Sequence, residues 1–494
     1  MAIPTVTGSE IEFGITLRND PDFDPIAACI LLVNAYREEP TGEILWDYDQ
    51  ENPLADARGF QVDGEKYTPN QQENIARNKT LINGARYYVD HAHPEYSSPE
   101  VTNARDLVIH EKAGERIIEI SRREASSMLD ANSQMLIYKN NSDRKGNSYG
   151  CHENYLMDRR TSFKQIVEHL MPFFVTRQVF AGAGKVGSEN RGSPCAYQVS
   201  QRADFFETEV ALDTMVKRPI INTRDEPHAD REKYRRLHVI VGDSNMSEYT
   251  IYLRHGVTSL VLSMIEDGAV TRDLLLRAPV RAIKQISHDP TCQAKVQLDN
   301  GKQMTAVELQ SEYLDMAQAY LSTKSPDPVL ADVMRQWEHV IDCLGRDPME
   351  LDTKIDWVIK KRMIEEFMDR KNLDWDSGPV EMLDLQYHDS RPEQGLFYIL
   401  ERQGRADRIV SEDEIVQAIH TPPTDTRAYF RGECLRRYPQ EVFGVNWDSI
   451  SFGVEGEPVK RIMMTEPLKG SKAHVSELLE RSSSAAELVK NLSG

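Results

Sequence analysis

Paired cysteines and long apolar runs are both missing from this 494-residue chain. Its six cysteines are scattered with no CxxC pair, which argues against a disulfide framework or a thiolate zinc site and favours a reducing cytoplasm. The most apolar stretch, residues 26–33, is far too short to cross a bilayer. Residues 1–14 lack a basic region followed by an apolar one, so we expect neither a secretory signal nor a membrane span.

The chain also lacks an excess of positive charge. Its 59 Lys and Arg residues against 79 Asp and Glu give a net charge of −20. A general nucleic-acid binder is therefore disfavoured, because phosphate contacts need a basic surface, although a local basic groove stays compatible with this balance. The length predicts two or three domains, or one large catalytic domain with a smaller companion.

Three common catalytic or nucleotide-binding motifs are absent or incomplete. There is no GxxxxGK[ST] loop and no GxSxG elbow. Residues 182–187 do spell GxGxxG, but turn-rich residues follow where the dinucleotide fingerprint needs a helix, so we interpret them as a loop. If the chain binds ATP, we expect the site to lie on a sheet that carries carboxylates.

The pattern of apolar residues predicts a mixture of strands and helices. Residues 9–15 alternate as in a half-buried strand, whereas residues 37–79 have no sustained periodicity and predict a long loop. Consecutive prolines at Pro422 and Pro423 mark the best domain boundary. Further strands are expected near residues 86–90, 135–138, 219–224 and 237–242, and helices over 24–36, 106–129, 329–344, 355–368 and 474–492, the last interrupted at 482–484.

Two carboxylates on the first strand are candidate metal ligands. Glu10 and Glu12 are two residues apart, so their side chains project from one face about 7 Å apart. Oxygen ligands of this kind suit Mg²⁺. For the pair taken alone, a solvated strand face is the better interpretation.

Residues 88–96 combine carboxylates, imidazoles and phenols at the end of a predicted strand. Tyr88 and Asp90 share a face there, and an aspartate held beside a metal-bound phosphate can serve as a nucleophile or a base. Ordinary turn residues explain the segment equally well.

Farther along, His152 and Glu153 should lie on opposite faces of a strand, so only one of them can enter a site. His152 alone would more often be structural, because Mg²⁺ disfavours nitrogen ligands.

The densest group of charged and polar side chains lies in residues 218–245 and includes Arg224 and His238. Arginines in this setting indicate bidentate contacts with phosphate or carboxylate. A charged surface helix over residues 230–236 is the alternative for the middle of the segment. It explains Arg224 and His238 less well.

Several long motifs, in this order, resemble the Pup ligase and Pup deamidase/depupylase family, which belongs to the glutamine-synthetase-like carboxylate-amine ligases. The resemblance covers essentially the whole chain. Within the family, the insertion around residues 46–60, the VDHAHPEY sequence and the C-terminal GSKAHVSELLE favour the deamidase/depupylase branch over the ligase. The motifs are GSEIEFG, NGARYYVDHAHPEY, YKNNSDRKGNSYGCHENYLM, PIINTRDEPHADREKYRRLHVIVGDSN and PPTDTRAYFRGECLRRY.

The resemblance implies an α+β fold in which helices pack on a curved antiparallel sheet that holds ATP and Mg²⁺ on its concave face. Residues 1–420 would form the catalytic domain, with the inserted loop at about 37–79, and residues 421–494 a small C-terminal domain. Trp447 is as well explained by an ordinary domain core as by contact with adenine. By position, the implied metal site is Glu10, Glu12, Tyr88, Glu95 and His152, and the implied nucleotide site is Arg202, Arg224, His238, Arg427 and Trp447.

The implied activity is hydrolysis of a side-chain amide at the C-terminal residue of Pup, a small disordered protein tag. Deamidation would convert a terminal Gln to Glu, and depupylation would free the lysine of a tagged protein. Asp90 would act on the amide either as the nucleophile or by activating water, with ATP as a cofactor that can stay bound as ADP and phosphate. The inserted loop would gate the site, and a local basic groove would bind the acidic tag.

Three other functions stay open at this stage. They are a Pup ligase of the same family, a small-molecule carboxylate-amine ligase, and an inactive Pup-binding adaptor. The expected partners are Pup and pupylated proteins rather than nucleic acid or membrane, and the sequence leaves the oligomeric state open.

Overall fold

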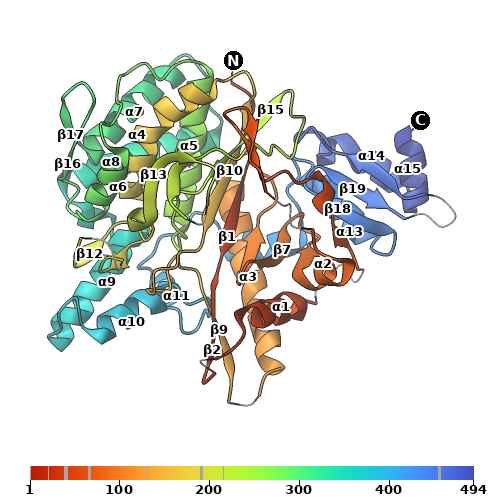
Figure 1. The fold of residues 1–494 in the computed structure, drawn as a ribbon, viewed down its shortest axis with the longest axis horizontal. Helices are drawn as coiled ribbons and strands as arrows, with labels where there is room; N and C mark the ends of the chain where they lie inside the picture. Colours follow the sequence, from red (N-terminus) through yellow and green to blue (C-terminus); the bar gives the residue numbers. More distant parts are fainter. Residues whose placement is uncertain are drawn as a thin grey trace.

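A six-stranded antiparallel sheet forms the centre of the protein in the computed structural model (Figure 1). The strand order is β15-β10-β1-β8-β7-β6, and every neighbouring pair is antiparallel. The structure describes residues 2–20, 22–37, 43–64, 68–130, 132–189, 193–214, 216–453 and 458–493. The six strands are β1 (Thr7–Glu12), β6 (Asn78–Thr80), β7 (Arg86–Asp90), β8 (His93–Ser97), β10 (Cys151–Asp158) and β15 (Tyr234–Val239).

The sheet has one covered face and one face that carries the polar residues. Along β1, Thr7, Ser9 and Ile11 are buried, while Glu10 and Glu12 alternate with them and are half-buried, as the two-residue period of a strand requires. The covered face packs against α1 (Pro25–Ala35), α3 (Ala104–Ser127) and α5 (Glu248–Glu266). Asp24 begins α1 by accepting hydrogen bonds from the backbone of Ile26 and Ala27.

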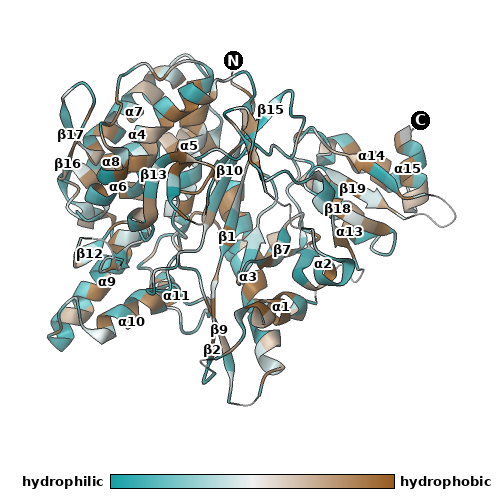
Figure 2. Cartoon of the chain, in the orientation of Figure 1, coloured by the Kyte–Doolittle hydropathy of each residue, from teal (hydrophilic) through white to brown (hydrophobic). Residues whose placement is uncertain are grey.

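Most of the remaining helices form a second layer on one side of the sheet (Figure 1). Hydrophobic residues are concentrated in α4 and α5, which are buried on most sides (Figure 2). No helix of the described residues is long and apolar enough to cross a membrane. The helices are α4 (Phe163–Ala181), α6 (Pro279–Ser287), α7 (Ala306–Leu321), α8 (Pro328–Arg346), α9 (Asp356–Lys371), α10 (Gly378–Tyr387), α11 (Leu396–Arg402) and α12 (Glu412–His420).

Several short strands connect these layers. Residues 182–187 form a loop and the two-residue strand β11, as the sequence predicted, and the described residues that follow are not helical. Residues 234–239 form β15, so the alternative of a helix over residues 230–236 is wrong. The short strands are β2 (Gly14–Arg18), β9 (Gln134–Tyr138), β11 (Lys185–Val186), β12 (Tyr197–Gln198), β13 (Phe206–Ala211), β14 (Arg218–Asn222), β16 (Lys295–Gln297) and β17 (Gln303–Thr305).

The chain after residue 421 has a hydrophobic core of its own. Its strands β18 (Val442–Asn446), β19 (Ser449–Phe452) and β20 (Lys460–Met463) pack with helices α13 (Ala428–Arg437), α14 (Lys472–Arg481) and α15 (Ala485–Ser493). The break between α14 and α15 falls at the three serines where the sequence predicted it. Ile44 and Ile82 complete this core, although they lie outside residues 421–494.

The insertion at residues 37–79 is more ordered than the predicted loop. It contains β3 (Leu45–Trp46), β4 (Ala55–Asp56), β5 (Phe60–Gln61) and α2 (Gln71–Arg77), and residues 78–79 belong to β6. The loop prediction is therefore wrong for residues 71–79, because a helix of seven residues, capped by the Asn70 side chain, is too short to give a periodic signal. Residues 38–42 and 65–67 of the predicted loop lie outside the described residues.

Strand β3 joins the insertion to the C-terminal sheet. It runs parallel to β18, with Trp46 beside Val445, and the ring of Trp46 lies edge-on to Trp447 at 5.4 Å between centroids. The four-stranded order is β20-β19-β18-β3. One strand of the C-terminal unit is thus supplied by a segment nearly four hundred residues earlier.

Candidate functional site

The register of the central sheet brings the predicted metal ligands together. Across β1, Glu12 is opposite Glu95 on β8, and Glu10 is opposite His152 on β10. Tyr88 is opposite Glu95 in the next pair of strands. Residues far apart in the sequence therefore share one small area of the open face.

Glu10, His152 and His238 form the first cluster, with one ligand atom of each within 4.8 Å of the others. Nδ1 of His152 lies 3.2 Å from Oε2 of Glu10. The amide of Asn154 donates a hydrogen bond of 2.9 Å to the other oxygen of Glu10. Burial acts to raise the pKa of Glu10, but the hydrogen bond to His152 and the charges of His238 and Arg236 hold the pKa well below its ordinary value.

Glu12, Asp90 and Glu95 form the second cluster, and it consists of carboxylates alone. Burial and the charges of Asp90, Glu10 and Glu12 raise the pKa of Glu95 well above its ordinary value. One buried oxygen of Glu95 has no hydrogen-bond partner. A bound cation would satisfy that oxygen and relieve the repulsion, so these residues fit Mg²⁺, which prefers oxygen ligands. The first cluster, with two imidazoles, fits Mg²⁺ less well.

Asp90 ends strand β7 with its carboxylate partly open to solvent. Nδ1 of His91 lies 2.9 Å from Oδ2 of Asp90. Burial acts to raise the pKa of Asp90, but the hydrogen bond and charge of His91 outweigh it and lower the pKa. The carboxylate is therefore ionised near neutral pH and stands beside the proposed cation ligands, as a nucleophile or base requires.

Tyr88 is opposite Glu95 in the sheet and is half-buried. Burial and the charge of Glu95 raise the pKa of Tyr88 well above its ordinary value, so it carries no charge near neutral pH. The guanidinium of Arg86 lies 3.8 Å from the centre of the Tyr88 ring and 3.9 Å from the Trp46 ring. Arg86 thus connects the residue beside the carboxylate cluster to the insertion.

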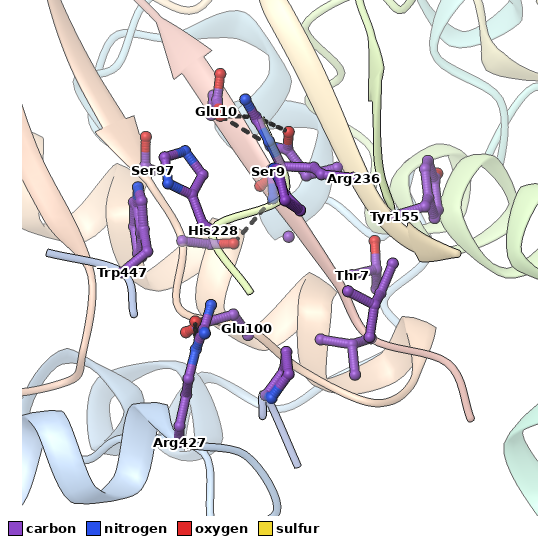
Figure 3. Close-up of a pocket in the computed structure, with 17 residues that line it drawn as sticks. Thr7, Ser9, Glu10, Ser97, Glu100, Tyr155, His228, Arg236, Arg427 and Trp447 are labelled. Atoms are coloured by element: carbon purple, nitrogen blue, oxygen red, sulfur yellow. Dashed lines mark hydrogen bonds and ion pairs between the residues drawn. The ribbon is translucent and has the colours of Figure 1, made fainter. Parts of the chain in front are cut away.

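A pocket opens between the central sheet and the C-terminal unit (Figure 3). Glu10 and Arg236 line it from the sheet, and Arg427 and Trp447 line it from the C-terminal side. Nε of Arg427 donates a 2.8 Å hydrogen bond to Glu100, so its charge is already balanced. Two predicted nucleotide-site residues, Arg427 and Trp447, therefore share a pocket with the predicted metal ligand Glu10.

The other predicted arginines lie elsewhere around the acidic clusters. Nε of Arg224 is buried without a hydrogen-bond partner, and its charge acts on both His91 and His238. Arg202 does not line the pocket. It donates to the backbone oxygens of Ile240 and Gly242, and Glu12 is the carboxylate that acts most on its charge.

Sequence reasoning missed three polar residues of the site. Asn154 and Arg236 contact Glu10, and Nδ1 of His93 lies 3.5 Å from Glu12. Asn154 follows His152 by two residues, and Arg236 precedes His238 by two, so strand alternation already placed each on the same face as a predicted residue. Glu153 points the other way, as expected, and pairs with buried Arg177.

This open antiparallel sheet, with carboxylates on its face and a pocket against a small C-terminal unit, defines a glutamine-synthetase-like fold. Two solved structures share it. The complex between Pup and its ligase PafA has a TM-score of 0.82 and 33% identity, covering 97% of this chain and 92% of that one. The structure of the Pup ligase PafA in complex with ADP has a TM-score of 0.75 and 35% identity, covering 85% and 96%.

A family model described as Pup-ligase protein matches residues 5–451, and the chain belongs to this family. It is 50% identical to a depupylase of Acidothermus cellulolyticus over 99% of both chains. It is 47% identical to a Pup deamidase/depupylase of Mycolicibacterium smegmatis, again over 99% of both. A Pup–protein ligase of Kineococcus radiotolerans is 41% identical over 82% of this chain and 90% of its own.

Proposed function

We propose that this protein is an ATP- and Mg²⁺-dependent amidohydrolase that converts the C-terminal Gln of Pup to Glu and cleaves the isopeptide bond between Pup and lysine. The observation that carries the proposal is full-length similarity to depupylases at 46–50% identity over 99% of the chain. The ligases match a smaller share of it. Its partners are then Pup and pupylated proteins, and its free cysteines suit a reducing cytoplasm.

The proposed nucleotide site is the pocket shared by Glu10, Arg236, Arg427 and Trp447. The ADP complex of PafA supports nucleotide binding. Glu12 and Glu95 would hold Mg²⁺, with Tyr88, Glu10 and His152 around them and with Asp90 close enough to act on the amide. When bound, the cation supplies positive charge that stabilises a developing oxyanion. His238 belongs to the first cluster, and the charge of Arg224 acts on both His238 and His91, so phosphate groups would lie near these residues.

Asp90 is the proposed catalytic residue. In one route, its carboxylate attacks the amide carbonyl, ammonia or the lysine amine leaves, and water then cleaves the resulting anhydride. In the other, it removes a proton from a water molecule that attacks the same carbon. Both routes convert one amide and one water into a carboxylate and an amine, so neither requires the energy of ATP hydrolysis.

The experiment is mass spectrometry of Pup ending in Gln, incubated with ATP, Mg²⁺ and either the wild type or Asp90→Asn. We expect conversion of the terminal amide to the acid by the wild type alone, with ATP binding retained in the variant. Full activity of the variant would exclude Asp90 from catalysis. If the wild type does not convert Pup ending in Gln but couples Pup ending in Glu to a lysine protein, the protein is a ligase instead.

The insertion is the proposed gate of this site. Asp56 and Thr223 are joined by a 2.5 Å hydrogen bond, and the backbone nitrogen of Asp225 donates to Ala55. These contacts hold the segment that follows β14 and carries Arg224 against the insertion. Replacing residues 49–64 with a short linker should change turnover and the range of pupylated proteins cleaved. Unchanged activity on both counts would disprove the gate.

A further inference from the structure

Arg431 lies on α13 and its side chain is completely buried. A guanidinium has five N–H groups, and that of Arg431 makes five hydrogen bonds. Nε and Nη2 donate to the backbone oxygen of Gly84 at 3.2 and 2.9 Å. Nη1 donates to the backbone oxygen of Trp447 at 2.9 Å, and Nη1 and Nη2 both donate to the carboxylate of Glu100. A buried charge whose donors are all occupied is held in one orientation.

These hydrogen bonds join three segments that are far apart in the sequence. Gly84 lies in the turn between β6 and β7, and β7 ends at Asp90. Glu100 lies three residues beyond the end of β8, the neighbour of β7 in the sheet. Trp447 lies in the turn between β18 and β19. Arg431 therefore fixes one end of two central strands relative to the C-terminal sheet.

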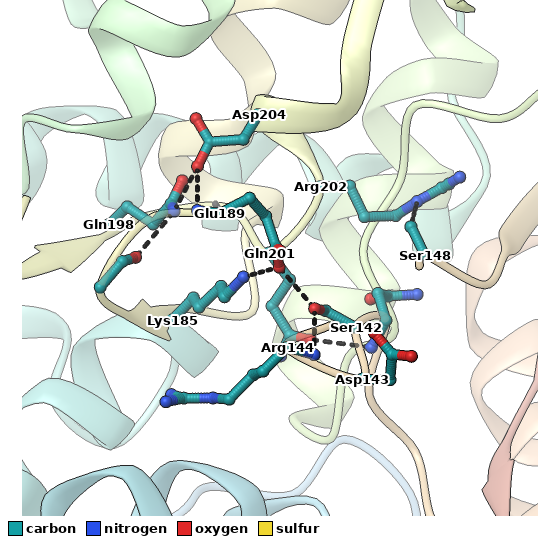
Figure 4. Close-up of polar contacts among 12 residues, drawn as sticks. Ser142, Asp143, Arg144, Ser148, Lys185, Glu189, Gln198, Gln201, Arg202 and Asp204 are labelled. Atoms are coloured by element: carbon teal, nitrogen blue, oxygen red, sulfur yellow. Dashed lines mark hydrogen bonds and ion pairs between the residues drawn. The ribbon is translucent and has the colours of Figure 1, made fainter. Parts of the chain in front are cut away.

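The buried Lys185–Glu189 pair is an example of a more local contact. Its two residues are four apart in the sequence, and Glu189 also accepts a hydrogen bond of 2.5 Å from the Ser142 hydroxyl (Figure 4). Arg431 and Glu100, in contrast, are 331 residues apart. Their ion pair connects the C-terminal unit to the central sheet.

Helix α13 packs so closely on the turn between β6 and β7 that the two cannot move independently. Gly84 has a positive φ of 83°, and a Cβ atom there would stand 3.1 Å from Cβ of Ala428. A Cβ atom at Gly432 would stand 2.2 Å from the backbone oxygen of Ile82. Both positions therefore favour glycine. A shift of the helix would displace the turn and the start of β7 with it.

The ring of Trp447 has a partner from each of two segments. The guanidinium carbon of Arg431 lies 5.0 Å from the ring centre, and the Trp46 ring lies edge-on at 5.4 Å, as is favourable for cation–π and aromatic pairs. Trp447 and Glu100 line the pocket between the sheet and the C-terminal unit (Figure 3). Arg431 is not among the residues that line it, so it can act on a bound ligand only through other side chains.

We propose that Arg431 is a positioning residue that holds the wall of the proposed nucleotide pocket and joins it to the strand that ends at Asp90. This proposal rests on the nucleotide-dependent amidohydrolase function. A ligand that contacts Trp447 meets a ring already in place, which lowers the entropic cost of binding. Because the same guanidinium binds Gly84, the pocket wall and β7 keep one relative position, as alignment of a substrate with Asp90 requires.

The test measures ATP affinity by calorimetry without Pup, and kcat for deamidation of Pup ending in Gln at saturating ATP. We expect Arg431→Met to weaken ATP binding about 10-fold and to lower kcat about 10- to 100-fold. Arg431→Lys keeps the charge beside Glu100 but has only three donors, so it should lose less than Arg431→Met. The matched control is Arg436→Met on the same helix, because Arg436 is 50% exposed and pairs with Glu433.

A mutant cycle shows whether Arg431 acts through the tryptophan ring. In a Trp447→Ala background, Arg431→Met should change ATP affinity by less than about threefold, because the ring that it holds is gone. An equal loss in both backgrounds would exclude this route. If Arg431→Met lowers the Tm but leaves ATP affinity and kcat at wild-type values, Arg431 has only a structural role and the proposal is wrong.

Two further outcomes separate the parts of the proposal. Unchanged kcat at saturating ATP would exclude the connection to β7, and if Arg431→Met does not fold, Arg431→Lys provides the same comparisons. A wild type that binds ATP but does not deamidate Pup would overturn the amidohydrolase function. Weaker ATP binding by Arg431→Met would still support its role in the pocket wall, because that measurement needs no turnover.

Discussion

Nδ1 of His91 lies 2.9 Å from Oδ2 of Asp90, so the proposed catalytic carboxylate has a hydrogen-bond partner in the adjacent residue. His91 adopts a positive φ of 51°, a conformation that few residues other than glycine adopt. The hydrogen bond and charge of Asp90 raise the pKa of His91. The pair therefore favours an ionised Asp90 and a protonated His91.

We predict that His91→Ala raises the pKa of Asp90. The hydrogen bond that favours the ionised carboxylate would be lost, so the acid limb of the activity profile should move to higher pH. The side chains of His91 and Asp90 are 61% and 37% exposed, and solvent screening should keep the shift below about one pH unit. The measurement is kcat/KM for deamidation from acid to neutral pH, with His169→Ala as the control. An acid limb that moves to lower pH would contradict this role.

A second prediction concerns Glu95, whose carboxyl is buried among other carboxylates. Glu95→Gln removes like-charge repulsion, so the metal-free protein should melt at the same or a higher temperature than the wild type. The same change removes a cation ligand, so the rise in Tm on adding Mg²⁺ should shrink. Thermal unfolding with and without Mg²⁺ measures both effects. If Mg²⁺ raises the Tm of the variant as much as that of the wild type, Glu95 is not a ligand of the cation.

Gly150 leads to a third prediction, because it lies against both acidic clusters. A Cβ atom at this position would stand 2.3 Å from Nε2 of His152 and 2.7 Å from Oε1 of Glu12. Gly150→Ala should therefore displace these ligands and reduce activity by at least about 10- to 100-fold, the range seen when ligand orientation is disturbed. Gly378→Ala is the control, since a Cβ atom there meets nothing within 4 Å. Activity in Gly150→Ala equal to that of the control would contradict the predicted displacement.

The fourth prediction concerns the attachment of the C-terminal unit. Burial acts to raise the pKa of Glu100, but the charges of Arg431 and Arg427 lower it to about 2. A depressed carboxyl stabilises the fold above its unfolded pKa near 4.5, and this contribution is lost as the pH falls through about 2. Glu100→Gln should cost roughly 3 kcal/mol in unfolding free energy at neutral pH.

Urea unfolding followed by tryptophan fluorescence would measure this cost, with exposed Glu477→Gln as the control. The difference between wild type and Glu100→Gln should be constant above about pH 5 and should shrink between pH 4.5 and 2. A difference that grows on acidification would have the wrong sign. It would show that another group, and not the ionised Glu100, holds the C-terminal helices.

Local patterns predicted much of this fold, because the strands and helices that position the site have strong periodicity. The spacing of Glu10 and Glu12 placed both on the open face of β1, as observed. Local patterns do not predict which residues face each other on neighbouring strands. The pairing of Glu12 with Glu95 and of Glu10 with His152 depends on contacts across the whole sheet. Only the resemblance to a family brought these residues together before the structure did.

Sequence patterns could not predict the shortest strands and helices either. Strand β3 has two residues, too few to show an alternation, and its partner β18 is distant in sequence. The contacts of Arg202 were equally hidden, since a charged residue's partner depends on tertiary packing. The resemblance to the family made Arg202 a candidate phosphate or nucleotide contact, but the direction of its side chain required the structure.

The pairing of β3 with β18 has a consequence for biosynthesis. Trp46 emerges from the ribosome early, but Val445, its neighbour in the sheet, is among the last tenth of the chain to be made. Long-range pairing of this kind is slow and leaves strand edges unprotected in the meantime. The proposed nucleotide pocket, with Trp447 in its wall, can therefore close only after translation is nearly complete. Nascent chains should be unable to bind nucleotide, whatever the state of their central sheet.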